Sequence, residues 1–291
     1  MRAFWLLGGA VLAACGADSD PPGFDQPAAA VHDPVADVYL VSNVHGAPLA
    51  ADGNGYITRV EPDGSMQRRW LAGGRDGVTL HAPRGLALAG EVLWVADLDR
   101  LRRFERRTGK ALAPVAVPGA TCLWGVAVAP DGTVYATDAG GDGVSAPTET
   151  DAIWRLATDG SLTALIRGTE LGQPRGIVAT ATGVYCVNWR DGAFFQVDHA
   201  GRRTDLARAP AAQLDGLARG GADTAADGRP LAPAWFASSH AGQCVYRFDA
   251  TGGVQTLPRT VVTPTGLGYD AVRRLLLLPL ANAGELQLLP L

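Results

Sequence analysis

The chain contains one short unit that recurs along most of its length, and this repeat limits the possible folds more than any other feature. Each copy has a glycine followed by alternating apolar residues and then a second apolar strand. The marker glycines are Gly85, Gly125, Gly176, Gly216 and Gly266, which lie 40, 51, 40 and 50 residues apart. Repeats of this length indicate a single architecture built from copies of one supersecondary unit.

Every copy predicts short antiparallel strands. The second strands include VLWVAD (92–97), TVYATD (133–138) and GVYCVN (183–188), and an earlier copy without a marker glycine begins with DVYLVSN (37–43). Third strands of alternating character follow, as in AIWRLATDG (152–160), and most copies have a fourth strand. The glycine-containing turns between them are typical of antiparallel hairpins.

Six such copies between residues 27 and 291 predict an all-β fold, a six-bladed β-propeller of four-stranded antiparallel blades. The alternative is a pair of β-sandwiches, which gives no reason for six copies of one unit. The last copy stops after its third strand. We therefore expect the N-terminal segment around Phe24 to Ala30 to supply an outer strand there and to close the ring.

The first fifteen residues, MRAFWLLGGAVLAAC, have the layout of an export signal. The apolar run is too short to span a bilayer, which requires about 20 apolar residues. Its small residues directly precede Cys15, an ending that resembles a bacterial lipoprotein signal. We therefore expect a signal peptide (1–14), a lipidated Cys15 with a flexible tether (15–26) and the propeller (27–291).

The resemblance to lipoproteins implies that the thiol of Cys15 is acylated and anchors the protein in the bacterial cell envelope. Residue 16 is Gly rather than Asp, which favours the outer membrane, on its periplasmic face or at the cell surface. A simple secretory signal is the alternative. We expect the remaining cysteines, Cys122, Cys186 and Cys244, to be buried as small hydrophobic residues.

Charge and motifs narrow the function classes. The formal net charge is −4, so the chain lacks the excess of basic residues that nucleic-acid binding requires. It has no GxSxG, Walker, HExxH or GxGxxG motif, which leaves the enzyme classes that use them without support. We expect a monomer whose partners are the membrane, through its lipid anchor, and a small-molecule ligand or an envelope protein.

Three stretches resemble the SMP-30/gluconolactonase/LRE-like propellers, which are close to the NHL-repeat propellers. They are YLVSNVHGAPLAADGNGYITRVEPDG (39–64), APRGLALAGEVLWVADLDRL (82–101) and VAVAPDGTVYATD (126–138). The resemblance extends from about residue 27 to the end of the chain. It implies a divalent cation, usually calcium, at the ring centre, and hydrolysis of lactones or related esters.

The family's metal-binding Asp in an Asp-Gly turn corresponds to Asp215. Its Asn-Gly-Leu-like turns correspond here to Arg84-Gly85-Leu86 and Arg175-Gly176-Ile177, and its first Glu aligns near Ala28. The metal ligands that this alignment and the face of the ring suggest are Asp215, Asn188 and Asp138. The catalytic candidates are Asp215 and His240, because an imidazole titrates near neutral pH and can act as a general base.

The loops after each second strand and the links between blades open on one face, where we expect binding. The ligand-binding candidates on it are Arg84, Trp124, Arg175, Asn43 and His45. An arginine near the axis needs a carboxylate or an anionic ligand. Arg84 and Arg175 therefore either pair with Asp215 or Asp138 or bind an anion. Turn formation is the alternative for the histidines and for Asp138 and Asn188.

Two functions compete. The first is a lipid-anchored propeller of the cell envelope that binds a small anionic ligand or an envelope partner at one face of the ring. The alternative is a divalent-metal-dependent hydrolase of the lactonase or esterase type, with Asp215 at the ring centre. A likeness of fold alone does not decide between them.

Overall fold

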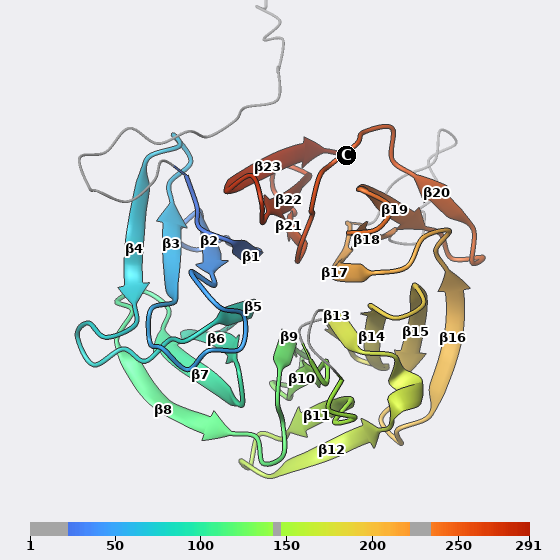
Figure 1. Cartoon of the computed structure of the whole chain (residues 1–291), viewed down its shortest axis with the longest axis horizontal. Coiled ribbons are helices and arrows are strands. Elements are labelled where there is room, and N and C mark those ends of the chain that lie inside the picture. Colours follow the sequence, from blue (N-terminus) through green and yellow to red (C-terminus); the bar gives the residue numbers. More distant parts are fainter. Residues whose placement is uncertain (1–22, 142–146, 222–233) are drawn as a thin grey trace, which may run out of the picture.

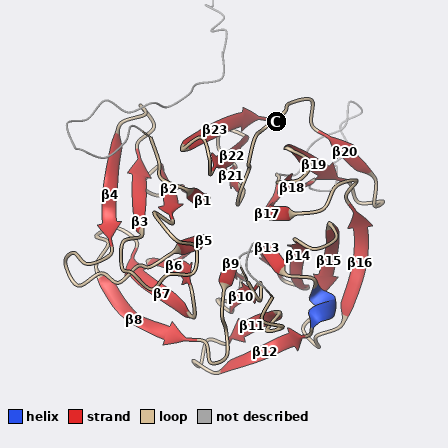
Figure 2. Cartoon of the chain, in the orientation of Figure 1, coloured by secondary structure: helices blue, strands red, loops and turns tan. Residues whose placement is uncertain are grey.

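The computed structural model describes residues 23–141, 147–221 and 234–291. In these ranges the strands form six antiparallel sheets that are arranged as blades around a central axis (Figure 1). Almost all regular structure is strand, with a single 3₁₀ turn, η1 (Thr169–Leu171), among the described residues (Figure 2). The predicted all-β, six-bladed β-propeller is confirmed. Nothing helical in the described residues is long and apolar enough to cross a membrane.

The blades follow the order of the chain, and each runs outward from its first strand. Blades 1 to 3 are β1 (Pro27–Asp33), β2 (Val38–Asn43), β3 (Tyr56–Val60), β4 (Met66–Ala72); β5 (Pro83–Ala89), β6 (Val92–Asp97), β7 (Arg100–Glu105), β8 (Ala111–Ala116); and β9 (Leu123–Val128), β10 (Val134–Asp138), β11 (Ala152–Leu156), β12 (Leu162–Arg167). Blades 4 to 6 are β13 (Pro174–Thr180), β14 (Gly183–Asn188), β15 (Ala193–Val197), β16 (Arg203–Arg208); β17 (Leu214–Arg219), β18 (Trp235–Ser239), β19 (Cys244–Phe248), β20 (Val254–Thr256); and β21 (Gly268–Asp270), β22 (Leu275–Leu280), β23 (Glu285–Pro290).

The N-terminal strand differs from the prediction in its place. We expected residues around Phe24 to Ala30 to form the outer strand of blade 6, but β1 is the innermost strand of blade 1 and pairs with β2. Within the described residues, blade 6 has three strands. The backbone of Ala30 lies close to Gly268: a Cβ added to Gly268 would lie 2.3 Å from the carbonyl oxygen of Ala30. The alanine-rich segment thus fits the narrow inner position.

The ring closes where the inner strands of the first and last blades meet. Gly266 donates its backbone N–H to the carbonyl oxygen of Ala28 at 2.8 Å, and Phe24 donates to that of Gly284 at 2.9 Å. Apolar side chains of both blades, including Tyr39 and Leu277, bury a shared cluster behind this contact. The N-terminal segment therefore joins the two ends of the ring by packing and hydrogen bonds.

The marker glycines of the repeat lie where each inner strand touches the inner strand of the next blade. A Cβ on Gly125 would lie 2.4 Å from the carbonyl oxygen of Arg175, and one on Gly216 would lie 2.1 Å from the backbone nitrogen of Leu267. Real Cβ atoms essentially never come within 3.0 Å of such atoms. The crowded centre of the ring thus explains why the repeat contains glycine.

The hydrophobic core is divided among the six interfaces between blades. Each interface contains its own cluster of buried apolar residues, for example Leu93 and Phe104 between blades 1 and 2, and Phe195 between blades 3 and 4. Burial of such side chains contributes roughly 1.5–3 kcal/mol each. This packing makes the ring a rigid support for the residues at its axis.

Candidate functional site

A cavity of about 300 Å³ opens at one end of the propeller axis. Its wall includes residues from the loops that follow the second strands: Val44, Pro48, Trp189 and His240. The cavity therefore lies on the face that the sequence predicted to carry binding residues. Its volume falls at the lower end of the range of small-molecule sites, roughly 300–1,000 Å³.

The floor of the cavity is built from one equivalent position in every blade, near the start of the inner strand. These six residues are Ala28, Arg84, Trp124, Arg175, Asp215 and Thr265. In blades 2 to 6 each precedes the marker glycine. The pairing register of β1, β5, β13 and β17 shifts at this position, and such bulges re-aim side chains.

Hydroxyl groups of the second strands hold this inner ring in place. Ser42 donates to the carbonyl oxygen of Arg84 at 2.7 Å, and Thr137 donates to that of Arg175, also at 2.7 Å. Thr137 also accepts a hydrogen bond from the backbone N–H of Gly125 at 2.8 Å. Each arginine is therefore fixed through its backbone by the blade that precedes it.

Two arginines and two tryptophans alternate in a stack across the floor. The Arg84 guanidinium carbon lies 3.9 Å from the ring centroid of Trp124. The Arg175 guanidinium carbon lies 3.5 Å from the centroids of both Trp124 and Trp189. Cations over aromatic faces are attracted by the ring quadrupole, by about 2 kcal/mol or more when they are desolvated. The stack holds both arginine side chains in the wall of the cavity.

Asp215 neutralises only one of these arginines. Its Oδ2 accepts a hydrogen bond from Nη1 of Arg175 at 2.8 Å, and its Oδ1 accepts one from Nε1 of Trp124 at 3.0 Å. Both members of the ion pair are nearly inaccessible, with 1% and 3% of their side chains exposed. Burial lowers the pKa of Arg175 to about 10, which still leaves it protonated at neutral pH. The ion-pair interpretation thus holds for Arg175.

Arg84 has no carboxylate partner among the described residues, although only 5% of it is exposed. Its Nη2 donates to the carbonyl oxygen of Pro48 at 2.9 Å, and its buried Nε has no hydrogen-bond partner. The charged residues in the cavity wall are Arg84, Arg175 and Asp215, so their formal charges sum to +1. The ion-pair interpretation therefore does not extend to Arg84 among the described residues.

His240 borders the same cavity, and its ring lies 5.4 Å from that of Trp189. Asn43 lies outside the cavity wall and is fully buried. Its side-chain amide donates to the carbonyl oxygen of Val41 and to the hydroxyl of Thr58, which is a structural role. His45 is also absent from the wall, and its Nδ1 lies 2.5 Å from Asp25.

Asp138 and Asn188 do not line the cavity, and both have structural partners. Asp138 accepts hydrogen bonds from the backbone N–H groups of Thr121, Cys122 and Gly140. Burial raises its pKa above the ordinary value despite these bonds. Asn188 donates to the carbonyl oxygen of Leu171 and accepts from the backbone N–H of Ala193. These are the contacts of turn-forming residues.

The side chains at the axis are not a suitable set of ligands for a divalent cation. Calcium takes six to eight oxygen ligands. Both oxygens of Asp215 already accept N–H donors, and the neighbouring blades contribute the guanidinium groups of Arg84 and Arg175. No group of three or more His, Cys, Asp or Glu side chains in the described residues could hold a metal ion. The expected calcium site at Asp215 is thus supported only by the resemblance of the sequence to gluconolactonase-type propellers.

Trp189 and Pro48 complete the site, and neither was among the residues predicted from the sequence. Trp189 directly follows Asn188, the last residue of β14, so its place in the loop after a second strand was available as a signal.

Cys15 lies outside the described residues. Cys122, Cys186 and Cys244 are buried, as the sequence predicted, and burial raises the pKa of Cys186 well above its usual value.

Comparisons with known proteins support the fold. No protein-family model matches the chain, and no curated protein matches its sequence. Among solved structures, a gluconolactonase from Xanthomonas campestris is 18% identical, with a TM-score of 0.68 over 92% of this chain and 86% of that one. The expected likeness to gluconolactonase-type propellers is therefore confirmed at the level of the fold.

Two further structures have the same fold and different functions. An auxiliary nutrient-binding protein from Bacteroides ovatus is 15% identical, with a TM-score of 0.65 over 97% of this chain and 72% of that one. A virginiamycin B lyase from Staphylococcus aureus is 14% identical, with a TM-score of 0.61 over 91% and 95% of the two chains. The fold thus serves binding and catalysis alike, and the site must decide the function.

Proposed function

We propose that this protein is a ligand-binding propeller that takes up a small organic anion in its axial cavity. The buried guanidinium of Arg84 is the observation that carries this proposal, because it has no carboxylate partner among the described residues. A buried charge without a counter-charge is costly. A bound anion would supply that counter-charge and satisfy the unpaired Nε.

The other walls favour an anion attached to an apolar or flat body. Trp124, Trp189, Pro27 and Pro48 border the cavity beside Arg84. A guanidinium presents its donors in a planar fork that matches a carboxylate. A small carboxylate with an aromatic or aliphatic body would therefore satisfy both the charge and the apolar surface.

The test uses benzoate as the anionic probe and benzamide as its neutral counterpart. We expect calorimetric titration of the purified protein to show benzoate binding at one site and at least tenfold weaker binding of benzamide. Arg84→Gln should weaken benzoate binding at least tenfold, because charged hydrogen bonds are worth about 1.5–3 kcal/mol. Arg107→Gln changes an exposed arginine elsewhere and serves as the matched control.

Equal binding of benzoate and benzamide would contradict an anion site. Unchanged benzoate affinity in Arg84→Gln, with the fold intact by circular dichroism, would exclude Arg84 as its anchor. Phosphate, tested in parallel, distinguishes a site for organic carboxylates from a general anion site.

We also propose that the propeller functions in the bacterial cell envelope, attached by a lipid on Cys15. The support is the sequence of the export signal and the small residues before Cys15. A palmitate analogue should label the wild-type protein in bacterial cells, and Cys15→Ser should lose the label and leave the membrane fraction. Labelling that persists in Cys15→Ser would contradict this anchor.

The second candidate is hydrolysis of a lactone or ester, which is favoured by one observation: His240 and Asp215 border the same cavity. Asp215 is already paired with Arg175, so His240 is the group available as a general base. Hydrolysis of glucono-δ-lactone above the uncatalysed rate, and its loss in His240→Gln, would favour this function. Activity that survives both His240→Gln and Asp215→Asn would exclude these residues as its catalytic groups.

A further inference from the structure

A second cavity, of about 420 Å³, lies between blades 5 and 6 and is separate from the axial site. Its wall comes from β18, β19, the segment after β20, β21 and β23. The two cavities share no lining residue. Any ligand of this cavity is therefore independent of the proposed anion site at the axis.

The cavity lies beside β23, the outermost strand of blade 6 among the described residues. Blades 1 to 5 have four strands, whereas in the described residues blade 6 ends with β23. The cavity reaches Leu289, Pro290 and Leu291, at and just after the end of that last strand. Blade 5 contributes only a three-residue outer strand, β20, on the other side. Among the described residues, blade 6 thus contributes no fourth strand to this interface, and blade 5 contributes a short one.

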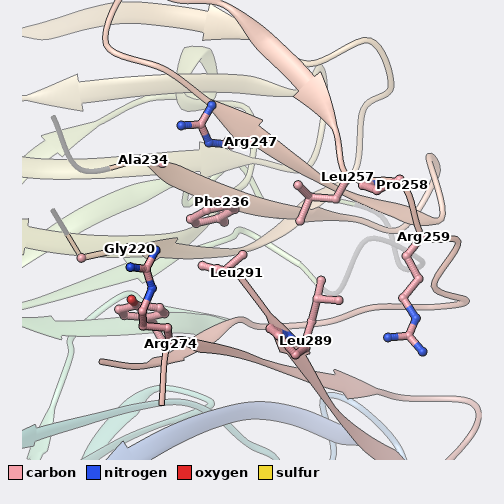
Figure 3. Close-up of a pocket in the computed structure, with 13 residues that line it drawn as sticks. Gly220, Ala234, Phe236, Arg247, Leu257, Pro258, Arg259, Arg274, Leu289 and Leu291 are labelled. Carbon is pink, nitrogen blue, oxygen red and sulfur yellow. The ribbon is translucent and has the colours of Figure 1, made fainter. Parts of the chain in front are cut away.

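The interior of the cavity is apolar. Figure 3 shows the side chains of Phe236, Leu257, Leu289 and Leu291 around a common space. Phe236 is buried, Leu257 and Leu289 are half-buried against the cluster between blades 5 and 6, and Leu291 is 39% exposed. These side chains offer an apolar group a surface that water would otherwise cover.

The rim of the cavity is positively charged. Arg247 and Arg259 border it on different sides (Figure 3), and none of the described residues that line it is Asp or Glu. Nη1 of Arg247 lies 3.5 Å from Oε1 of Gln255, and Arg259 forms no ion pair with any described residue. An apolar space with cationic groups at its mouth is complementary to a molecule with an apolar tail and an anionic head.

We propose that the cavity between blades 5 and 6 binds a single-chain amphipathic anion, with its apolar chain against Phe236, Leu257 and Leu289 and its head near Arg259. A linear carboxylate of medium chain length has this chemistry. Burial of its methylene groups against these side chains would remove apolar surface from water. The arginine adds a charged hydrogen bond at the exposed end.

Dodecanoate, used below its micellar concentration, is the probe, and calorimetry with the purified full propeller is the measurement. The titration is carried out with the axial site saturated by benzoate, and we then expect one dodecanoate site per chain. Leu289→Glu should weaken binding at least tenfold, because it places a negative charge beside the apolar chain, and Arg259→Gln should weaken it about threefold to tenfold. The matched controls are Val35→Glu and Arg107→Gln, which change exposed residues in blades 1 and 2.

Several results would overturn the proposal. They are absence of dodecanoate binding, equal affinity for dodecyltrimethylammonium, and unchanged affinity in Leu289→Glu with the fold intact by circular dichroism. Sedimentation with phosphatidylglycerol vesicles without dodecanoate binding would indicate a membrane surface instead. Dimerisation that Leu289→Glu abolishes, again without dodecanoate binding, would indicate a second copy of the chain. Arg84→Gln should leave dodecanoate affinity unchanged, which separates this test from that of the axial site.

Discussion

Arg273 of blade 6 binds the carboxylate of Asp37 in blade 1 through two hydrogen bonds, of 2.8 Å from Nη1 and 2.6 Å from Nη2. Nη1 also donates to Asp270 at 2.9 Å, and the hydroxyl of Tyr39 donates to the same Asp270 oxygen at 2.9 Å. In the described residues no strand is shared between the first and last blades. This charged network therefore reinforces the closure that the inner strands begin.

We expect Arg273→Met to lower the free energy of unfolding by about 1–2 kcal/mol near neutral pH. The fully buried carboxylate of Asp270 loses a charged hydrogen bond, while the pair with the half-exposed Asp37 is screened by water and adds little. Urea unfolding followed by fluorescence measures the difference. Arg107→Met, which replaces an exposed arginine in blade 2, is the control and should change stability by less than about 0.5 kcal/mol.

The stability of this closure should also depend on pH. The hydrogen bond from Arg273, followed by that from His32, holds the pKa of Asp37 well below its usual range. A depressed carboxyl pKa stabilises the folded state above the unfolded pKa, which is about 4, and this stabilisation is lost as the pH falls below it. The difference in the free energy of unfolding between the wild type and Asp37→Asn should therefore become smaller as the pH falls from about 5 to 3. A difference that grows in this range would contradict the assignment.

The repeat predicts a specific sensitivity at its marker glycines. Gly125→Ala should destabilise the propeller by about 1–3 kcal/mol or more, because the new Cβ would lie 2.4 Å from the carbonyl oxygen of Arg175 and force the inner strands apart. Gly160→Ala is the comparison, since Gly160 lies in a hairpin turn with open space around it and a φ of 87°. Its cost should be only the strain of the left-handed backbone, of order 1 kcal/mol. Thermal unfolding of both variants tests this order.

The repeat made the architecture predictable because the glycine requirement at the axis is strict and appears five times. The closure was less predictable. The repeat predicted that the segment around Phe24 to Ala30 closes the ring, but it placed this segment as an outer strand of blade 6, which was wrong. Contact with Gly266 and Gly268 decides for the inner position, and this contact spans the length of the chain.

The site was predictable where its residues belong to the repeat. Arg84, Trp124, Arg175 and Asp215 all precede a marker glycine, so their meeting at the axis follows from the register. The partner choice of each arginine depends on side-chain geometry that the sequence does not specify. Trp189 does not precede a marker glycine, so the repeat did not predict that it belongs to the site.

Replacing the two axial arginines should have different effects on the free energy of unfolding. Arg175→Met should cost about 3–5 kcal/mol, because it leaves the buried carboxylate of Asp215 without its cation. Arg84→Met should leave the free energy of unfolding unchanged or raise it, because it removes a buried charge that has no counter-charge among the described residues. Urea unfolding in buffer without organic anions provides both values. A large loss in Arg84→Met would show that this guanidinium is structural.

Calcium should not stabilise the folded propeller through its axis. A native site with a dissociation constant of 10 µM would raise the free energy of unfolding by about 2.7 kcal/mol at 1 mM calcium. We expect no change in the melting temperature, because Asp215 is already engaged by Arg175 and Trp124. The melting temperature of Arg175→Met with and without calcium is the comparison, since this substitution frees one oxygen of Asp215. A clear rise with calcium in the wild type, abolished by Asp215→Asn, would instead establish a metal centre at the axis and restore the hydrolase as the leading function.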